Sequence, residues 1–553
     1  MNRLKYSLLF AALGAIFFIP FLGGVHLFDW DEINFAEVSR EMIINEDYLH
    51  ITINFQPFWE KPPFFFWLQV LSMKLFGINE FAARFPNAVC GILTLVILYN
   101  IGSKLYSSTF GFIWAGVYLG SVLPFLYFKS GIIDPVFNLF IFLGIYFFIL
   151  FFWKKENQPQ ILLLQNKWLY LMAAGIFAGL AILTKGPVAF LIICLVFIVY
   201  WIFQRFRLFV GPHHFLIFSI IAAAVTLVWF GIETLKNGPW YVTEFVRYQY
   251  RLFSTPDAGH AGFPGYHFVV LLIGCFPASV FALRGFFKMP APSHHYQQDF
   301  SLWMKILFWV VLILFTIVKS KIVHYSSLSY FPLTFLAALV IERLVARQLT
   351  FARWMKVMLS IIGGLYIIII IALPFLGMNV ETLKPLIKDP FAVANLDAAV
   401  NWTGFEILPG VLLFLVLALS LWNLSRDYIG RGLMLLFGGM PVFVMLTLIF
   451  FIGRIEAYSQ RAAIEFLESK AAEDAYIIPH GYRTYTHYFY GQLQPGQNPN
   501  RHDKEWLLHG DVDKDVYVIS KVNRNSALEE NPNIERISSK NGFIFYKRKV
   551  KQE

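Results

Sequence analysis

The sequence that decides the fold is residues 29–63, DWDEINFAEVSREMIINEDYLHITINFQPFWEKPP, which follows an apolar N-terminal segment. This stretch holds eight acidic residues, although only 14% of the chain is charged. Carboxylates that face a polar cavity beside a bilayer are candidates for function. The stretch therefore predicts a functional loop at a membrane surface, with the rest of the chain holding that loop in place.

The composition of the 553 residues indicates a polytopic membrane protein. Hydrophobic residues make up 58% of the chain and the mean hydropathy is +0.59, whereas soluble domains carry roughly 25% charged residues. The net charge of +10 comes mainly from short loops between apolar segments, which indicates membrane topology and no nucleic-acid partner. Three cysteines, Cys90, Cys194 and Cys275, lie in apolar runs, so we expect buried thiols without a disulfide or a thiolate metal site.

Thirteen apolar stretches have the length of membrane spans, about 17 to 25 residues. We expect the first to be a retained helix, because its apolar run can span and no convincing cleavage site follows it. The predicted fold class is an α-helical polytopic membrane protein with a small C-terminal soluble α/β domain. The predicted spans are residues 6–28, 84–102, 109–127, 135–153, 168–184, 187–203, 215–232, 268–287, 302–318, 325–341, 357–377, 407–425 and 432–452.

The distribution of lysine and arginine predicts the orientation of the chain. With the N-terminus in the cytoplasm, the basic and acid-poor loops fall inside and the acidic 29–63 stretch falls outside, which satisfies the positive-inside rule. We therefore expect a transmembrane domain at residues 1–453, with an outer catalytic loop at 29–83, and a periplasmic α/β domain at 454–553. This is the topology of a multi-pass inner-membrane protein.

Within the outer loop, residues 33–46 and 64–78 read as two helices lying in the membrane interface. Phe35, Val38 and Met42 recur at helical spacing, with Glu37 and Glu41 on the other face. In the C-terminal domain, EAYSQRAAIEFLESK predicts an amphipathic helix, while DAYIIPH, DVYVISKV and FIFYKRK predict strands. This domain has no phosphate loop and no metal spacing, so we expect it to be a lid or a docking module.

Asp31 and Glu32 open the first of these predicted helices. Acidic residues suit a helix N-terminus, so capping is one explanation. The other is that a carboxylate here takes a proton from, or orients, an acceptor that attacks a sugar carbon.

Glu60 and Lys61 stand before two prolines that fix the backbone. A lysine held at headgroup level is a natural partner for a phosphate, although it could instead be a snorkelling lysine in a turn. Asp134 lies between two spans on the outer side, where it could cap a helix, orient Lys61 or hold a substrate hydroxyl or amine.

Lys185 and Lys321 add positive charge on the same outer face, against the topology rule. A phosphate-bearing lipid is the simplest reason for this charge, while the alternative is that lysines end helices whose C-termini favour cations. His260 lies in a Gly-containing outer loop. With Glu60 near, it could bind Zn²⁺ or another divalent metal, because imidazole and carboxylate are ordinary zinc ligands; the alternative is a solvated histidine.

Read together, these motifs resemble the C-type glycosyltransferases of the superfamily of lipid A aminoarabinose transferases and protein mannosyltransferases. The resemblance covers residues 1 to about 340 and implies the C-type glycosyltransferase fold, inversion at the sugar, and no nucleotide sugar at the site. It rests on Asp31-Glu32, Ala36-Glu37, Ser39-Arg40-Glu41-Met42, Glu60-Lys61-Pro62, Asp134-Pro135, Thr184-Lys185-Gly186, His260, Lys321 and Tyr325.

The resemblance also implies a role for each of these residues. Asp31 is expected at the acceptor, Lys61 at the phosphate that leaves, and Asp134 beside them as the third catalytic residue. Further substrate contacts are expected from Glu32, Lys185, Lys321 and Tyr325, and metal binding from Glu60 and His260. The expected partners are a polyprenyl-phosphate sugar donor, membrane lipids, and an acceptor that is a lipid A-type glycolipid, a glycan or a protein.

Two other functions also need many spans and buried charge. One is a transporter or flippase of lipid-linked sugars, which tends to show inverted repeats and charges near mid-membrane; we find no repeat, and the charges gather on one face. The other is a polysaccharide polymerase or ligase, which shares the lipid-linked donor.

Overall fold

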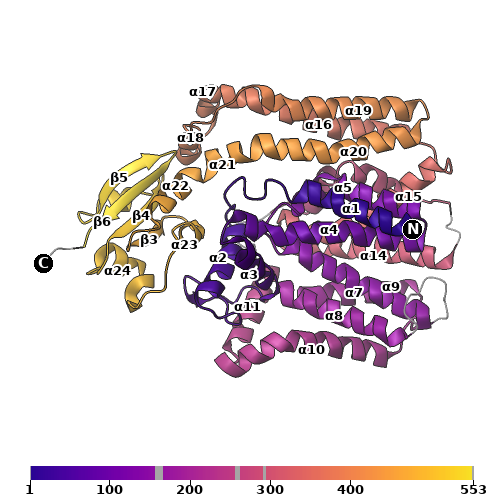
Figure 1. Ribbon diagram of the computed structural model, residues 1–553, viewed down its shortest axis with the longest axis horizontal. Helices are drawn as coiled ribbons and strands as arrows, with labels where there is room; N and C mark the ends of the chain where they lie inside the picture. The colour runs from indigo at the N-terminus through magenta and orange to yellow at the C-terminus, as the bar shows by residue number, and fades with distance from the viewer. Residues whose placement is uncertain (1, 156–165, 256–261, 291–293, 551–553) are drawn as a thin grey trace.

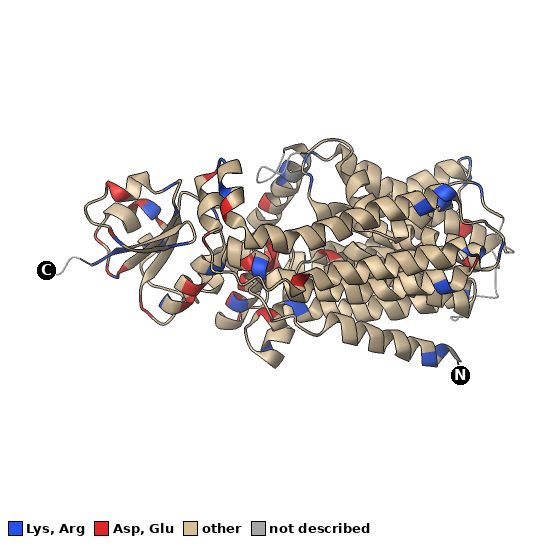
Figure 2. Ribbon diagram, turned by 90° about the horizontal axis from the view of Figure 1, so that it is seen from above, with Lys and Arg blue, Asp and Glu red and all other residues tan. Residues whose placement is uncertain are grey.

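The computed structural model describes residues 2–155, 166–255, 262–290 and 294–550. Helices running side by side form one elongated body, and a small sheet domain follows at one end (Figure 1). The N-terminus lies at the opposite end of this body from the sheet. Charged residues gather in the sheet domain and at the two ends of the helical body, while the middle of the long helices is almost free of them (Figure 2). This distribution is that of a multi-pass membrane protein.

Nine helices of the described chain are long and apolar enough to cross a membrane. They are α4 (Glu80–Leu105), α7 (Asp134–Lys155), α8 (Lys167–Lys185), α10 (Pro212–Asn237), α14 (His295–Ile317), η3 with α15 (Val323–Ser329 and Tyr330–Val345), α16 (Arg353–Met378), η5 with α19 (Phe405–Ile407 and Leu408–Ser425) and α20 with its extensions (Ile429–Ser459). The predicted helical membrane fold is confirmed, although the predicted number of thirteen spans is not.

The difference in number comes from short and broken helices. The predicted span 268–287 is two helices, α12 (Tyr266–Gly274) and α13 (Ala278–Gly285), which meet at 116°; counting them as one gives up to ten spans. The predicted span 109–127 is likewise divided into α5 (Ser108–Leu119) and α6 (Val122–Tyr127). The N-terminal α1 (Asn2–Phe18) and α9 (Val188–Phe203) have 17 and 16 residues. Hydropathy alone cannot reveal such breaks, because the broken segments remain apolar throughout.

The outer loop contains the two predicted helices, α2 (Asp31–Ile44) and α3 (Phe64–Phe76), and a hairpin of β1 (Thr52–Ile53) and β2 (Gln56–Pro57). Helix α3 exposes Leu71 and Leu75, as expected for a helix at the membrane interface. Helix α2 does not lie open at the interface, because its polar face is buried as well as its apolar face. Arg40 binds Glu37 through two nitrogens and also donates to the Leu493 carbonyl oxygen at 2.7 Å.

The C-terminal part is a four-stranded sheet in the order β3-β4-β6-β5, packed against helix α22 (Arg461–Lys470), which follows the short helix α21 (Gly453–Ser459). Strands β3 (Tyr476–His480) and β4 (Val516–Lys521) run parallel, whereas β6 (Phe543–Arg548) is antiparallel to both of its neighbours. The sequence predicted these three strands and missed β5 (Glu535–Lys540), which is exposed along its whole length and has no apolar face to detect.

The remaining helices connect these parts. The helix that begins as α20 (Ile429–Thr447) continues through a π-helical turn, Leu448–Ile452, into α21. It therefore runs through the predicted domain boundary at 453/454. Short helices include α11 (Trp240–Ser254), α17 (Val380–Leu383), η4 (Lys384–Leu386), α18 (Pro390–Asn395), α23 (Thr486–Phe489), η7 (Pro499–His502), α24 (Lys504–His509) and α25 (Ser526–Glu529).

Candidate active site

A cavity of about 860 Å³ opens where the outer loop meets the ends of the long helices. It brings together side chains from six segments that are separate in sequence. Of the predicted site residues, seven line it: Asp31, Glu32, Glu60, Lys61, Asp134, Lys185 and Tyr325. Asp31 and Lys61 thus face one common space, which is the condition that a shared catalytic role requires.

Three of these side chains stand at the start or end of a helix. Asp31 is the first residue of α2 and Asp134 the first of α7, while Lys185 is the last residue of α8. The turn after Lys185 depends on Gly186, which has a φ of +111° and so adopts a conformation that other residues rarely take. A Cβ at Gly186 would also stand 2.8 Å from the Phe245 ring.

A buried ion pair forms the floor of the cavity. Lys185 Nζ donates to Asp134 Oδ1 at 2.5 Å, and the two side chains are 15% and 4% exposed. The ammonium also lies over the rings of Tyr325, at 5.2 Å, and Phe137, at 5.6 Å. Carboxylate and rings together stabilise a cation in a place where water is scarce.

His324 stands between the two aspartates. Its Nε2 is 3.7 Å from Asp31 Oδ2 and 3.9 Å from Asp134 Oδ2. Asp31 is 34% exposed at its side chain, whereas Asp134 is 4% exposed. Asp31 is therefore the carboxylate that an incoming group can reach, while Asp134 is the buried partner of Lys185.

Lys61 approaches from the other side of the cavity. Its ammonium lies 5.1 Å from the centre of the Tyr248 ring on α11, and no carboxylate comes within ion-pair distance of it among the residues that the structure describes. Its backbone is fixed by Tyr241, whose hydroxyl donates to the Phe58 and Lys61 carbonyl oxygens. Lys61 is consequently a positive charge available to an anionic ligand.

Glu32 has a structural partner that the sequence analysis did not assign. Arg84 binds it through two nitrogens, at 3.0 and 2.7 Å, and the backbone N–H groups of Phe28 and Gly131 donate to it. Burial by itself would raise the pKa of Glu32, but the charge and hydrogen bonds of Arg84 outweigh burial and hold that pKa below its ordinary value. Because its carboxylate oxygens already accept these hydrogen bonds, we assign Glu32 a structural role in the cavity wall and no substrate contact.

Lys321 is not brought into the cavity. Its ammonium donates to the carbonyl oxygens of Phe315, Thr316 and Val318, at the end of α14. This is the helix-ending role that was the alternative in the sequence analysis, and Lys321 is therefore not among the substrate contacts that we propose.

The predicted metal pair is only half within the described structure. Glu60 lines the cavity, whereas His260 lies outside the described residues. In the described ranges no three His, Cys, Asp or Glu side chains are arranged to hold a metal ion. The expectation of zinc therefore stays a prediction.

Much of the remaining cavity wall is apolar, with polar side chains such as Asn34, Asn138 and Gln249 among the apolar ones. Val188, Leu191, Ile192, Val318 and Ile322 line its membrane side. Asn34 Oδ1 is buried and has no hydrogen-bond partner within the described chain. A charged mouth above an apolar wall suits an amphipathic ligand with an anionic head.

Sequence reasoning gave no role to three residues of this site: His324, Tyr248 and Arg84. A signal for Arg84 was present, since an arginine at the edge of an apolar span needs a buried partner. His324 and Tyr248 gave no comparable signal, because their importance comes from neighbours that only the fold supplies.

The sequence of the chain is similar to those of known glycosyltransferases. A family model described as dolichyl-phosphate-mannose-protein mannosyltransferase matches residues 60–230. The undecaprenyl phosphate-alpha-4-amino-4-deoxy-L-arabinose arabinosyl transferase of Erwinia tasmaniensis is 27% identical over 384 residues, which is 67% of this chain and 66% of that protein. Transferase 1 of the same description from Proteus mirabilis is 26% identical over 63% of this chain and 61% of its own length. The alignments thus span just under two thirds of the curated relatives.

The fold comparison extends over nearly the whole chain. The crystal structure of ArnT from Cupriavidus metallidurans bound to undecaprenyl phosphate superposes with a TM-score of 0.76 at 18% identity, covering 98% of both chains. Together these similarities confirm the resemblance drawn in the sequence analysis.

Proposed function

We propose that this chain, a C-type glycosyltransferase of the aminoarabinose transferase and protein mannosyltransferase superfamily, transfers a sugar from a polyprenyl-phosphate donor to an acceptor with inversion. The observation that carries the proposal is the single cavity that holds Asp31, Lys61, Asp134 and Lys185 above an apolar wall. The acceptor is a lipid A-type glycolipid, a glycan or a protein.

The donor fits this cavity by its charge and by its chain. Lys61 has no carboxylate partner among the described residues, so its ammonium can meet the donor phosphate. Lys185, paired with Asp134, adds a second positive charge to the same cavity. The apolar side chains of α9 and α14 can take the first isoprene units, so the donor can enter sideways from the outer leaflet.

The acceptor step uses the exposed aspartate. The acceptor oxygen attacks the anomeric carbon and gives its proton to Asp31, while the bond from that carbon to the phosphate oxygen breaks. The electron pair stays with the polyprenyl phosphate, whose growing negative charge is stabilised by the fixed cations. His324 lies within 4 Å of both Asp31 and Asp134 and is placed to interact with either carboxylate during the reaction.

We also propose that the reaction takes place on the periplasmic side of the inner membrane. Helix α2, whose first residue Asp31 lines the cavity, lies with the sheet domain at one end of the helical body, and the N-terminus lies at the other end (Figure 1). The basic, acid-poor loops belong to the N-terminal end, which the positive-inside rule assigns to the cytoplasm.

The test is mass spectrometry of envelope glycolipids from cells that lack the chain, complemented with the wild type or with Asp31→Asn. We expect loss of one glycosylated product in the deletion strain, with the lipid-linked sugar accumulating on the outer leaflet, and rescue by the wild type alone. Rescue by Asp31→Asn to wild-type levels would refute the assignment of Asp31.

The same experiment separates the alternatives. A transporter or flippase would leave the lipid-linked sugar on the inner leaflet when it is deleted. A polysaccharide ligase would instead lose polymer from the surface while single-sugar modifications stay in place.

A further inference from the structure

A second cavity, of about 1000 Å³, lies between the C-terminal sheet domain and the outer loop. Trp30 and Glu60 line this cavity and also the donor cavity described above. The two spaces are therefore neighbours with a common wall, and a molecule in the second cavity can extend toward Asp31. We call the second cavity the upper cavity.

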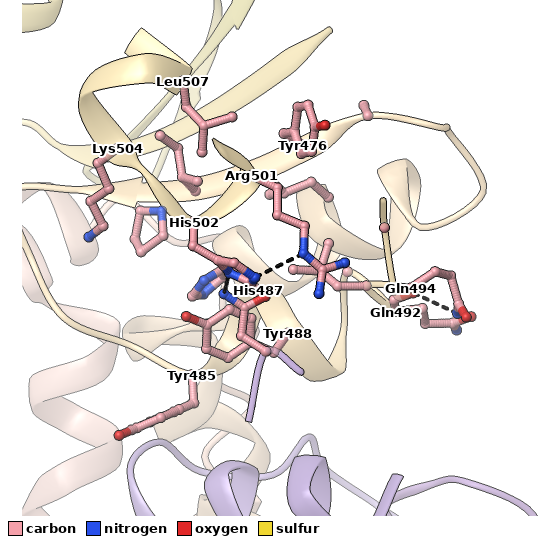
Figure 3. A pocket seen from close by; sticks show the side chains of 18 of the residues that line it. Tyr476, Tyr485, His487, Tyr488, Gln492, Gln494, Arg501, His502, Lys504 and Leu507 are labelled. Atoms are coloured by element: carbon pink, nitrogen blue, oxygen red, sulfur yellow. Dashed lines mark hydrogen bonds between the residues drawn. The ribbon is translucent and has the colours of Figure 1, made fainter. Parts of the chain in front are cut away.

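The wall of the upper cavity is rich in aromatic and amide side chains. Figure 3 shows rings and amides from the segment after β3 around one hollow. The ring of Tyr485 stands edge-on to Trp30 at 4.9 Å, next to the donor cavity. Rings for stacking on sugar faces, with amides for hydroxyl groups, suit a carbohydrate. The side chains that matter here are Tyr476, Tyr485, Tyr488, Gln492 and Gln494.

The charge available in the upper cavity is positive. Arg483 and Lys504 line it and are exposed, and neither forms an ion pair within the described ranges. Four acidic residues line it: Glu473 binds Lys470, Asp474 binds Lys514, Asp513 accepts from the Tyr476 hydroxyl, and Glu60 has no ion-pair partner in the described ranges. Glu60 stands with Trp30 at the border with the donor cavity, and it is outnumbered by Arg251, Arg483 and Lys504, which are unpaired cations in the same ranges, so the balance of charge favours an anion.

A buried histidine is also directed at this space. His487 lines the upper cavity and is 4% exposed, and its Nδ1 has no hydrogen-bond partner in the described part of the chain. Burial, with a contribution from the Lys504 charge, lowers the pKa of His487 to about 3. The ring is therefore neutral at physiological pH and has both a donor and an acceptor nitrogen. A buried polar atom without a partner is rare in folded proteins and marks a place where a ligand can supply one.

The upper cavity is tied to the catalytic loop by a neighbouring pair. Arg501 donates to His502 Nε2 at 2.9 Å, as the dashed line in Figure 3 shows. His502 contacts Asn54 and Gln56, each at 3.0 Å, on the hairpin β1–β2. Glu60 and Lys61 follow this hairpin in the sequence. The contacts of His502 therefore connect the wall of the upper cavity to the segment that carries the donor-site lysine.

We infer that the upper cavity binds the headgroup of the acceptor, an anionic carbohydrate that carries a phosphate or a carboxylate, and presents it to the donor cavity past Trp30 and Glu60. That this ligand is the acceptor rests on the proposed function, whereas the binding of an anionic sugar can be measured independently of it. The positive groups Arg483 and Lys504 meet the anion, while the aromatic wall meets the sugar ring.

The test is a saturation-transfer NMR titration of the purified full-length protein with three probes: glucose 1-phosphate, glucuronate and methyl glucoside. We expect at least one anionic probe to bind about tenfold or more tightly than the neutral methyl glucoside at low salt, with the preference shrinking as salt rises. Phosphate and carboxylate acceptors are told apart by which anionic probe binds. Equal binding of all three probes, or no binding, would overturn the inference.

Variants locate the site. Arg483→Gln combined with Lys504→Gln should weaken the anionic probe about tenfold or more, while Lys504→Arg should keep its affinity. Lys540→Gln is the matched control. Lys540 lies on the exposed strand β5 and pairs with Glu465, so its replacement should leave the affinity for the probe unchanged. An unchanged affinity in the double variant would place the probe elsewhere and refute the inference.

A parallel titration with undecaprenyl phosphate separates this inference from the proposed function. If undecaprenyl phosphate raises the melting temperature of the wild type and of the double variant while anionic sugars do not bind, only the upper cavity is misassigned. If anionic sugars bind as expected and undecaprenyl phosphate does not, the donor assignment fails and the sugar site stands.

Discussion

At the scale of single residues, the adjacent acidic residues Asp31 and Glu32 have different environments. Asp31 is one-third exposed and open to the cavity, whereas Glu32 is buried against Arg84 and two backbone N–H groups. The difference arises because successive residues on a helix point about 100° apart. One therefore faces the cavity and the other faces α4.

Replacing Lys61 by alanine should remove the cation that meets the donor phosphate. We expect transfer to fall roughly 10²–10³-fold, the loss typical of one charge-stabilising contact in a water-poor site. The measurement is the transfer rate of the purified variant, with undecaprenyl phosphate affinity measured beside it. Lys74→Ala is the control, since Lys74 stacks on Tyr48 in the same loop; an equal loss in both variants would contradict the role of Lys61.

Arg84→Met should act on stability rather than on chemistry. It leaves the Glu32 carboxylate buried with only backbone partners, and breaking such a pair costs about 3–5 kcal/mol. A lower melting temperature that is partly restored by adding Glu32→Gln is the expected result. A wild-type melting temperature in Arg84→Met would show that the pair contributes little.

The raised pKa of Glu41 predicts that the stability of the folded protein depends on pH. Burial, together with the charge of Glu37, raises the pKa of Glu41 from 4.5 to about 8. Between these values the folded chain keeps a proton that the unfolded chain has lost, so stability falls as pH rises, by at most about 1.4 kcal/mol per pH unit. Glu41→Gln should flatten this fall in melting temperature between pH 5 and 8, and an unchanged slope would argue that Glu41 ionises normally.

At the scale of elements, the helix junctions decide where the charges stand. Lys185 ends α8, and the turn through Gly186 returns the chain into α9 after two residues. This tight turn holds Lys185 against Asp134, fifty-one residues earlier in sequence. The ion pair thus depends on backbone geometry as much as on charge.

Gly186→Ala should therefore damage both stability and activity. The new Cβ meets Phe245 at 2.8 Å, at a φ of +111°, and we expect a loss of more than about 1 kcal/mol and a slower transfer rate. Gly364→Ala is the matched control, because its Cβ meets nothing within 4 Å inside α16 and should stabilise by roughly 0.5–1 kcal/mol. Thermal unfolding and transfer assays measure both, and equal behaviour of the two variants would contradict the strained turn.

At the scale of the whole molecule, most charged residues lie toward the two ends of the helical body and in the sheet domain (Figure 2). The sheet domain closes over the outer loop, where the Tyr490 hydroxyl accepts from the Leu27 N–H at 2.6 Å and Arg40 reaches the Leu493 carbonyl oxygen. These contacts cover the polar face of α2. The sheet domain and the first loop together enclose the upper cavity, and the first loop also contributes to the donor cavity.

The proposed orientation predicts opposite accessibility of the two ends. In a variant with its three native cysteines replaced by serine, Lys540→Cys should react with a membrane-impermeant maleimide in intact spheroplasts. Lys5→Cys should react only after lysis, because the N-terminus lies at the far end of the helices. Labelling of both positions in intact spheroplasts would refute the orientation.

The sequence by itself determined the membrane class, the positions of the apolar helices, three of the four C-terminal strands and seven of the residues that line the donor cavity. These depend on local hydropathy, on periodicity and on charges that stand out in apolar surroundings. Only the tertiary structure decided which charges are free: Glu32 is taken by Arg84, Lys321 by three carbonyl groups, and His324 comes between two aspartates. The reason is physical, since a side chain's role depends on partners from distant segments, and these meet only when the helices have packed.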